Sequence, residues 1–261
     1  MKEPAEDFPW WLLVLGASGG WLFWRVATDG LYAKVLETLA KGIGVTVLVT
    51  LLAFGAAALM GMGLAVAVLS QRLWLRQLAR LYIEVVRGVP ILVLLLYVAF
   101  VLAPAAVDLW NLATRWTGID PLKTRDLPLL WRAVAALAIA YSAFLAEVFR
   151  AGILAVPRGQ IEGAMALGLT GWLRFRLIVL PQALRTVLPP LGNDFVSMVK
   201  DSSLVSVLGV ADVTQLGKVA AAGNFRYFET YNVVALIYLA LTVGLSLALR
   251  RLEKHLRRRR G

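Results

Sequence analysis

The stretch IGVTVLVTLLAFGAAALMGMGLAVAVL, which runs from Ile43 to Leu69, contains no charged residue. An α-helix needs roughly 20 apolar residues to cross a bilayer core about 30 Å thick, and this stretch exceeds that length. Three other segments share its character. Val89–Val107 and Tyr231–Leu249 contain no charged residue, and Leu130–Phe149 contains one near each end. Four such segments in one chain predict an all-α membrane protein.

The composition supports this prediction and excludes several kinds of chemistry. Of the 261 residues, 60% are hydrophobic and 16% are charged, whereas an average soluble domain is about 45–50% apolar and about 25% charged. The chain has no cysteine and one histidine, His255, which lies among the arginines near its end. We therefore expect neither a thiolate metal site nor catalysis by cysteine or histidine.

The net charge of +11 comes from basic residues that lie between the apolar segments rather than along one face, so we expect no nucleic-acid partner. Loops that face the cytoplasm carry an excess of Lys and Arg. Most of the 27 Lys and Arg fall in residues 70–88, in residues 150–185 and after residue 249. This distribution predicts cytoplasmic loops at the first two places and a cytoplasmic C-terminus. The later spans then place the N-terminus in the cytoplasm as well.

Two further segments are less regular. Pro9–Trp24 is a shorter apolar run with tryptophans at both ends, as is typical of membrane interfaces; it either crosses the bilayer or lies on its surface. The apolar segment Ile178–Val199 contains residues that disturb a spanning helix, namely Pro181, Arg185, Pro189, Pro190 and Gly192. We expect a discontinuous helix here, whose freed backbone groups are satisfied inside the protein.

Asp194 is the one acid well inside an apolar segment, at a depth where a charged group costs about 2.5–3.5 kcal/mol. No basic residue lies three or four positions away, so its partner comes from another span, another subunit or a bound cation. Asn193 and Ser197 offer hydrogen bonds nearby, which makes all three candidates for substrate binding; alternatively, Asp194 orients the broken helix. Glu147 is a further candidate, although it most simply pairs with Arg150.

The segment 151–180 is a long amphipathic loop between two spans. Pro157 favours a helix from Arg158 to Leu167, which Gly168 then ends. One apolar stripe follows the helical spacing and is formed by Ile161, Ala164, Met165 and Gly168. The stripe either packs on the bilayer and the chain's own spans or fits a groove on a soluble partner.

The same loop carries a motif with fixed spacing. The pattern E-A-A-x3-G-x9-I-x-L-P is matched by Glu162, Ala164, Gly168, Ile178, Leu180 and Pro181, with Gly163 in place of the first Ala. This motif resembles the signature cytoplasmic loop of the permease subunits of bacterial ABC importers. The chain from about Leu39 to Leu252 is similar to polar amino-acid uptake permeases, including the segment LYIEVVRGVPILVLLLY with Arg-Gly-x-Pro at Arg87, Gly88 and Pro90.

The resemblance implies the type I ABC importer permease fold, with five core transmembrane helices and, in this chain, one extra N-terminal helix. It divides the chain into an extension with the extra transmembrane helix (residues 1–37), a transmembrane domain (38–252) and a basic cytoplasmic tail (253–261). The coupling loop of the transmembrane domain covers about 151–180. Such proteins are multi-pass components of the bacterial inner membrane.

The resemblance also implies a function: translocation of polar amino acids, with Asp194 suiting cationic ones, delivered by a solute-binding protein. The other implied partners are an ATP-binding subunit, a second permease copy or a sister chain, and the lipid bilayer. The residues expected to dock on the ATP-binding subunit are Arg158, Ile161, Glu162, Gly163, Ala164, Leu167 and Gly168. The flanking arginines of the loop, such as Arg174, offer contacts to lipid head groups instead.

The chain has no G-x4-G-K-[ST] phosphate loop. We therefore expect no catalytic residue, metal or cofactor in it, with ATP and Mg²⁺ bound by the partner subunit. A secondary carrier or channel for small polar solutes is the alternative function, but such proteins usually place several charges inside the membrane. A membrane scaffold and an intramembrane hydrolase are further alternatives; for the hydrolase, no second buried aspartate is expected to join Asp194.

Overall fold

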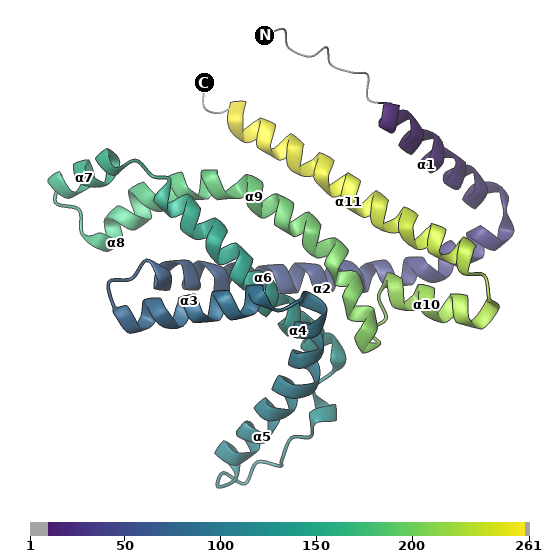
Figure 1. Ribbon diagram of the computed structural model, residues 1–261, viewed down its shortest axis with the longest axis horizontal. Coiled ribbons are helices and arrows are strands. Elements are labelled where there is room, and N and C mark those ends of the chain that lie inside the picture. Colours follow the sequence, from purple (N-terminus) through teal and green to yellow (C-terminus); the bar gives the residue numbers. More distant parts are fainter. Residues whose placement is uncertain (1–9, 259–261) are drawn as a thin grey trace.

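The computed structural model describes residues 10–258, which form helices joined by short turns, with no strand among them (Figure 1). The helices are α1 Trp10–Thr28, α2 Gly30–Val68, α3 Leu73–Gly88, α4 Ile91–Tyr97, α5 Ala103–Thr114, α6 Leu129–Leu154, α7 Arg158–Ala166, α8 Gly171–Arg174, α9 Leu180–Asp201, α10 Val213–Asn224 and α11 Tyr227–Arg258. Wider π turns at Val98–Leu102 and Phe175–Val179 join α4 to α5 and α8 to α9, and 3-10 turns lie at Thr124–Asp126 and Ser202–Leu208.

Four of the described helical segments are long and apolar enough to cross a membrane: α2, Ile91–Thr114, α6 and Tyr227–Arg251. Each contains, to within two residues at one end, all of one of the four segments predicted from the sequence, so those predictions are confirmed. A fifth span is formed if Gly171–Leu208 and Val213–Asn224, which meet at a bend of 49°, count as one. This gives the expected five-helix core. α1 is helical as well, but its 19 residues reach only about 28 Å, and its membrane crossing stays a prediction.

Small side chains let α2 approach the central helix α6 closely. Ala53 and Ala57 of α2 and Ala136 of α6 are almost completely buried. The closest approach is at Gly61, where a Cβ atom would lie 3.0 Å from the Cβ atom of Leu145. In lipid, helix association depends on such packing because lipid tails are as apolar as leucine. The contact between α2 and α6 therefore forms the main core of the bundle.

Residues 70–88, predicted as a cytoplasmic loop, instead form the helix α3, which packs on α2 and α6. Ala79, Ile83 and Val86 are buried at helical spacing, and the Tyr82 hydroxyl lies 2.8 Å from that of Ser142 on α6. The prediction counted charges and not their period, so it did not include this helix; the cytoplasmic position of the segment stays a prediction. Apolar residues that recur every three or four positions bury one side of a helix even where arginines cover another.

The predicted break in the span around Pro189 and Pro190 is also wrong. α9 runs through both prolines as one helix from Leu180 to Asp201. Each proline removes an N–H donor, but helices in membrane proteins tolerate this where neighbouring groups satisfy the freed backbone carbonyls. The chain changes direction later, after the 3-10 turn, where Gly209 adopts a left-handed φ of 82°.

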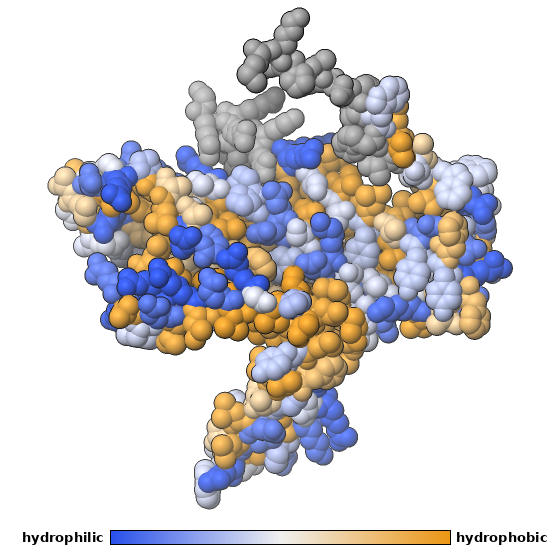
Figure 2. All heavy atoms as spheres, in the orientation of Figure 1, coloured by the Kyte–Doolittle hydropathy of each residue, from blue (hydrophilic) through white to orange (hydrophobic). Residues whose placement is uncertain are grey.

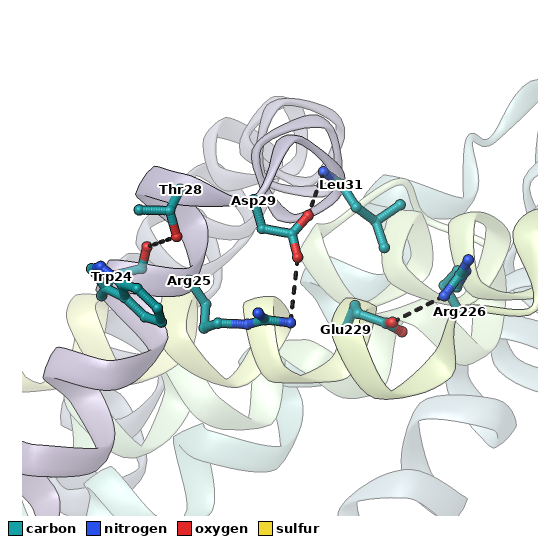
Figure 3. Close-up of polar contacts among 7 residues, drawn as sticks. All are labelled: Trp24, Arg25, Thr28, Asp29, Leu31, Arg226 and Glu229. Carbon is teal, nitrogen blue, oxygen red and sulfur yellow. Dashed lines mark hydrogen bonds and ion pairs between the residues drawn. The ribbon is translucent and has the colours of Figure 1, made fainter.

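A polar turn joins α1 to α2 (Figure 3). The Arg25 guanidinium lies 3.3 Å from the Asp29 carboxylate, which also accepts a hydrogen bond from the Leu31 backbone N–H at 3.0 Å. Arg25 also lies over the rings of Trp21 and Tyr32, at 6.0 and 5.4 Å. These contacts hold α1 against the beginning of α2, close to the start of α11.

Candidate functional site

The first candidate region is the loop of α7 and α8, at one end of the bundle (Figure 1). α7 covers Arg158–Ala166, one residue shorter than predicted, and Pro157 occupies the capping position before it. Gly168 has a φ of 73°, and the backbone N–H of Leu169 donates to the Ala164 carbonyl at 3.1 Å. Glycine is favoured in this left-handed conformation, which closes a helix by satisfying its last carbonyls. The predicted end at Gly168 is therefore confirmed.

The predicted apolar stripe of α7 does not form one face. Ile161 is half-buried against a cluster with Val156 and Val179, and Ala164 is buried. Met165 and Leu167 point away from the protein, with 50% and 82% of their surface exposed. The sequence spacing does not show which residues of the stripe are buried. In the structure the π turn Phe175–Val179 packs against α7 and covers only part of the stripe.

The other predicted docking residues of this loop are accessible. Arg158, Glu162, Gly163 and Gly168 are exposed. Within the described residues, no side chain of α7 forms a hydrogen bond or an ion pair with another part of the chain. The loop thus exposes apolar side chains that this subunit does not cover and charged side chains that it does not pair.

The second candidate region lies between α6 and α9. Tyr141 of α6 donates a hydrogen bond of 2.7 Å to the Asp201 carboxylate at the end of α9. Asp194 lies two helical turns before Asp201 and therefore on the same side of α9. It is half-buried and forms no hydrogen bond or ion pair with any residue that the structure describes. A carboxylate in this position is available to a cation.

Ser197 shares the face of Asp194 and is half-buried, whereas Asn193 is exposed. Glu147 is bound to Arg150 at 2.7 Å, which confirms the predicted pair. Two contacts fix the antiparallel register of the helices: Tyr141 meets Asp201, and Gly152 faces Val187. Glu147 lies between these levels, at about the height of Asp194. The four substrate candidates therefore lie at a similar height in the bundle, on two neighbouring helices.

Sequence reasoning missed a second buried acid, Asp212, which is fully buried before α10. Its carboxylate accepts hydrogen bonds from the Gln215 N–H at 2.8 Å and from the Tyr238 hydroxyl at 3.0 Å. Asp followed by Gln three residues later is a helix-start signature, so the sequence held a signal for it. Asp212 is bound within its own hairpin, which makes it a structural residue rather than a partner for Asp194.

Comparison with known proteins places these features in context. The sequence profile described as "Binding-protein-dependent transport system inner membrane component" matches residues 57–260. The chain is 40% identical over 179 residues to the glutamine transport system permease protein GlnP of Escherichia coli (strain K12). The aligned region covers 69% of this chain and 74% of that protein. It is 33% identical over 214 residues to the probable amino-acid permease protein YxeN of Bacillus subtilis (strain 168), covering 82% and 89%.

Solved structures show the same architecture. The crystal structure of an amino acid ABC transporter with histidines matches with a TM-score of 0.71 and 35% identity, over 85% of this chain and 96% of that one. An inward-facing structure of the MetNI methionine ABC transporter matches with a TM-score of 0.65 at 19% identity, over 84% and 96%, and supports the fold alone. The bundle is that of a type I ABC importer permease.

Proposed function

Because the chain belongs to the family of binding-protein-dependent transport system inner membrane components, it is a permease subunit of an ATP-driven importer, and we propose that it carries polar amino acids with a preference for cationic ones. Membership in this family sets aside the alternative of a secondary carrier or channel. The names of its relatives support amino acids as the substrate class. The unpaired Asp194, two helical turns from Asp201 on the same side of α9, supports the preference, because carboxylates attract an additional positive group on the substrate.

The accessible coupling loop carries the mechanism that we propose. Met165 and Leu167 project from a short helix whose end is fixed by Gly168, and they fit an apolar groove on an ATP-binding subunit. Glu162 would accept a charge-assisted hydrogen bond there. ATP and Mg²⁺ belong to that subunit, so nucleotide closure would move α7 and, through it, the ends of α6 and α9.

The complete importer that we propose has two permease copies, or one copy with a sister chain, around a central path in a bacterial inner membrane. A solute-binding protein delivers substrate on the side of α10, and both termini and α7 face the cytoplasm. The basic residues of the coupling loop and of the C-terminal tail support this orientation. In this arrangement residues 1–37 add a transmembrane helix to the domain of residues 38–252.

Docking is tested by crosslinking, because the chain contains no cysteine. We expect Leu167→Cys, 82% exposed, to crosslink to the ATP-binding subunit in the assembled complex. Val219→Cys on α10 is an exposed control, at 61%, and should not. Crosslinks from position 167 to lipid or to other permease residues alone would refute the docking.

Substrate preference is tested by ATP-driven uptake of radiolabelled amino acids into proteoliposomes. We expect Asp194→Asn to weaken the affinity for arginine by about tenfold, the value of one lost charged hydrogen bond, and to affect glutamine less. Asp108→Asn, an exposed acid on α5, is the control. An equal loss for arginine and glutamine would contradict a preference set by Asp194.

A further inference from the structure

The helix α3 divides into three faces, which is unusual beside a bilayer. Ala79, Ile83 and Val86 are buried against α2 and α6. A second face exposes large apolar side chains over more than half of their surface: Trp74, Leu78, Leu81 and Val85. At 100° per residue, Arg76, Arg80 and Arg87 fall together on a third face, with Arg72 just before the helix. We call these four residues the arginine ladder.

The arginine ladder has no acidic partner in the part of the chain that the structure describes. The ion pairs there join Arg25 to Asp29, Arg150 to Glu147, and Arg226 to Glu229. Glu84, at the edge of the ladder, joins none of them. The Nε atom of Arg76 is even buried without a hydrogen-bond acceptor. Guanidinium groups left unpaired in this way are available to an anion.

The ladder leads from the coupling loop to the candidate substrate site. From residue 72 to residue 87 it rises about 22 Å along the helix. α3 begins at the end of the bundle that holds α7 and α8 and ends near the middle, and hydrophilic side chains gather over this region (Figures 1 and 2). At the inner end, Arg87 lies 5.7 Å from the ring of Phe144, which in turn packs beside Tyr141, the partner of Asp201.

The ladder face is better explained by water than by lipid. An arginine facing hydrocarbon is costly, and the same helix offers a separate, apolar face to the lipid tails. Four like charges along one helix also repel one another, so they persist only where water or a bound anion screens them. A water-filled passage along α3 satisfies both conditions.

We propose that the arginine ladder lines the inward exit path of the importer and attracts the α-carboxylate of the amino acid, while Asp194 and Asp201 attract its ammonium group. Arg87 holds the carboxylate beside the acidic pair. Arg80, Arg76 and Arg72 then bind it in turn as the substrate moves toward the coupling-loop end. This inference rests on the proposed function, since it assigns the second charge of the same substrate.

Water access to the ladder is tested on single-cysteine variants of the assembled complex, since the chain has no cysteine of its own. We expect Arg76→Cys and Arg80→Cys to react with a hydrophilic, membrane-impermeant methanethiosulfonate reagent. Leu78→Cys and Leu81→Cys, exposed on the apolar face of the same helix, should be labelled much less than the two arginine positions. Equal labelling of both faces, or labelling of neither, would overturn the water-filled path.

Carboxylate attraction is tested by ATP-driven uptake of radiolabelled glutamine and arginine. We expect Arg80→Gln and Arg87→Gln to slow uptake of both by about tenfold, whereas Arg115→Gln, exposed at the end of α5, should not. Uptake at the wild-type rate would overturn the ladder, and so would a loss accompanied by dissociation of the ATP-binding subunit. If the wild-type complex accumulates neither amino acid, the proposed substrate class fails instead, while the labelling pattern still reports on the path.

Discussion

Two short helices, α7 and α10, lie before and after α9 in the chain, at opposite ends of the bundle, and are held in opposite ways. α7 has one buried residue, Ala164, and local backbone bonds close its end. α10 is bound to three other elements: Asp212 caps it and binds Tyr238, the Val213 N–H donates to Thr46 at 3.4 Å, and Lys218 donates to Ser206 at 3.0 Å.

The difference indicates which end of the subunit is fixed by its own chain. At α10, buried and partly buried hydrogen bonds hold the helix, and removing Tyr238 would leave the fully buried Asp212 without its side-chain partner on α11. At α7, the chain fixes the backbone but makes few side-chain contacts, so the exposed side chains are free to contact a partner subunit. We expect substitutions at α10 to change the stability of the fold and substitutions at α7 to change transport.

The largest effect should follow Gly168→Asp. The residue adopts a φ of 73° and a Cβ atom there meets open space in this chain, so the substitution adds strain of only about 1–2 kcal/mol but places a charge in the docking surface. We expect ATP-driven uptake in proteoliposomes to be abolished while the thermal unfolding temperature of the complex changes little. Normal uptake would remove the assignment of α7 as the docking helix.

Asp212→Ala should have the largest effect on stability. It removes a helix cap, worth about 1 kcal/mol, and takes one of the two hydrogen-bond partners from the half-buried Tyr238 hydroxyl, at about 1–3 kcal/mol. We expect a loss of about 3 kcal/mol in the free energy of unfolding, measured by denaturation of the purified complex in detergent. Asp108→Ala, at an exposed position, serves as the control. Similar losses for the two variants would contradict the claim that the contacts of Asp212 stabilise the α10 end of the subunit.

Gly42→Ala tests the same end through packing. A Cβ atom at Gly42 would lie 2.6 Å from the Val213 backbone nitrogen, whereas one at Gly44, on the same helix, would meet nothing within 4 Å. Since overpacking costs about 1–3 kcal/mol, we expect about 2 kcal/mol of destabilisation from Gly42→Ala. Gly44→Ala should be neutral or slightly stabilising, and equal behaviour of the pair would contradict the close contact between α2 and α10.

The smallest effect should come from Gly163→Ala in α7. An added Cβ atom meets nothing within 4 Å of the subunit, and alanine favours a helix over glycine by about 1 kcal/mol. The E-A-A motif has alanine at this place, so we expect retained transport and a gain in α7 helicity below that value. A loss of uptake comparable to that of Gly168→Asp would show that the partner surface needs the missing Cβ.

Much of the fold could be predicted from the sequence. The four apolar segments identify their spans because hydrocarbon tolerates few charges, and the spacing from Glu162 to Pro181 predicts the coupling loop that we propose. Gly168 marks the end of α7 because the left-handed conformation favours glycine. Charge counting did not reveal the helix α3, and proline counting wrongly predicted a break in α9, since neither shows whether a neighbouring helix covers the segment.

The sequence by itself determined the class of the protein, its spans and the end of α7 at Gly168, because hydropathy, helix capping and motif spacing are local properties of the chain. Only the tertiary structure decided that Tyr141 binds Asp201, that Asp212 is satisfied inside its hairpin and that α2 and α6 cover the side of α3 formed by Ala79, Ile83 and Val86. These features depend on which helices pack together, and packing partners are far apart in the sequence. The chemistry of the proposed path therefore arises from contacts between helices rather than from any one segment.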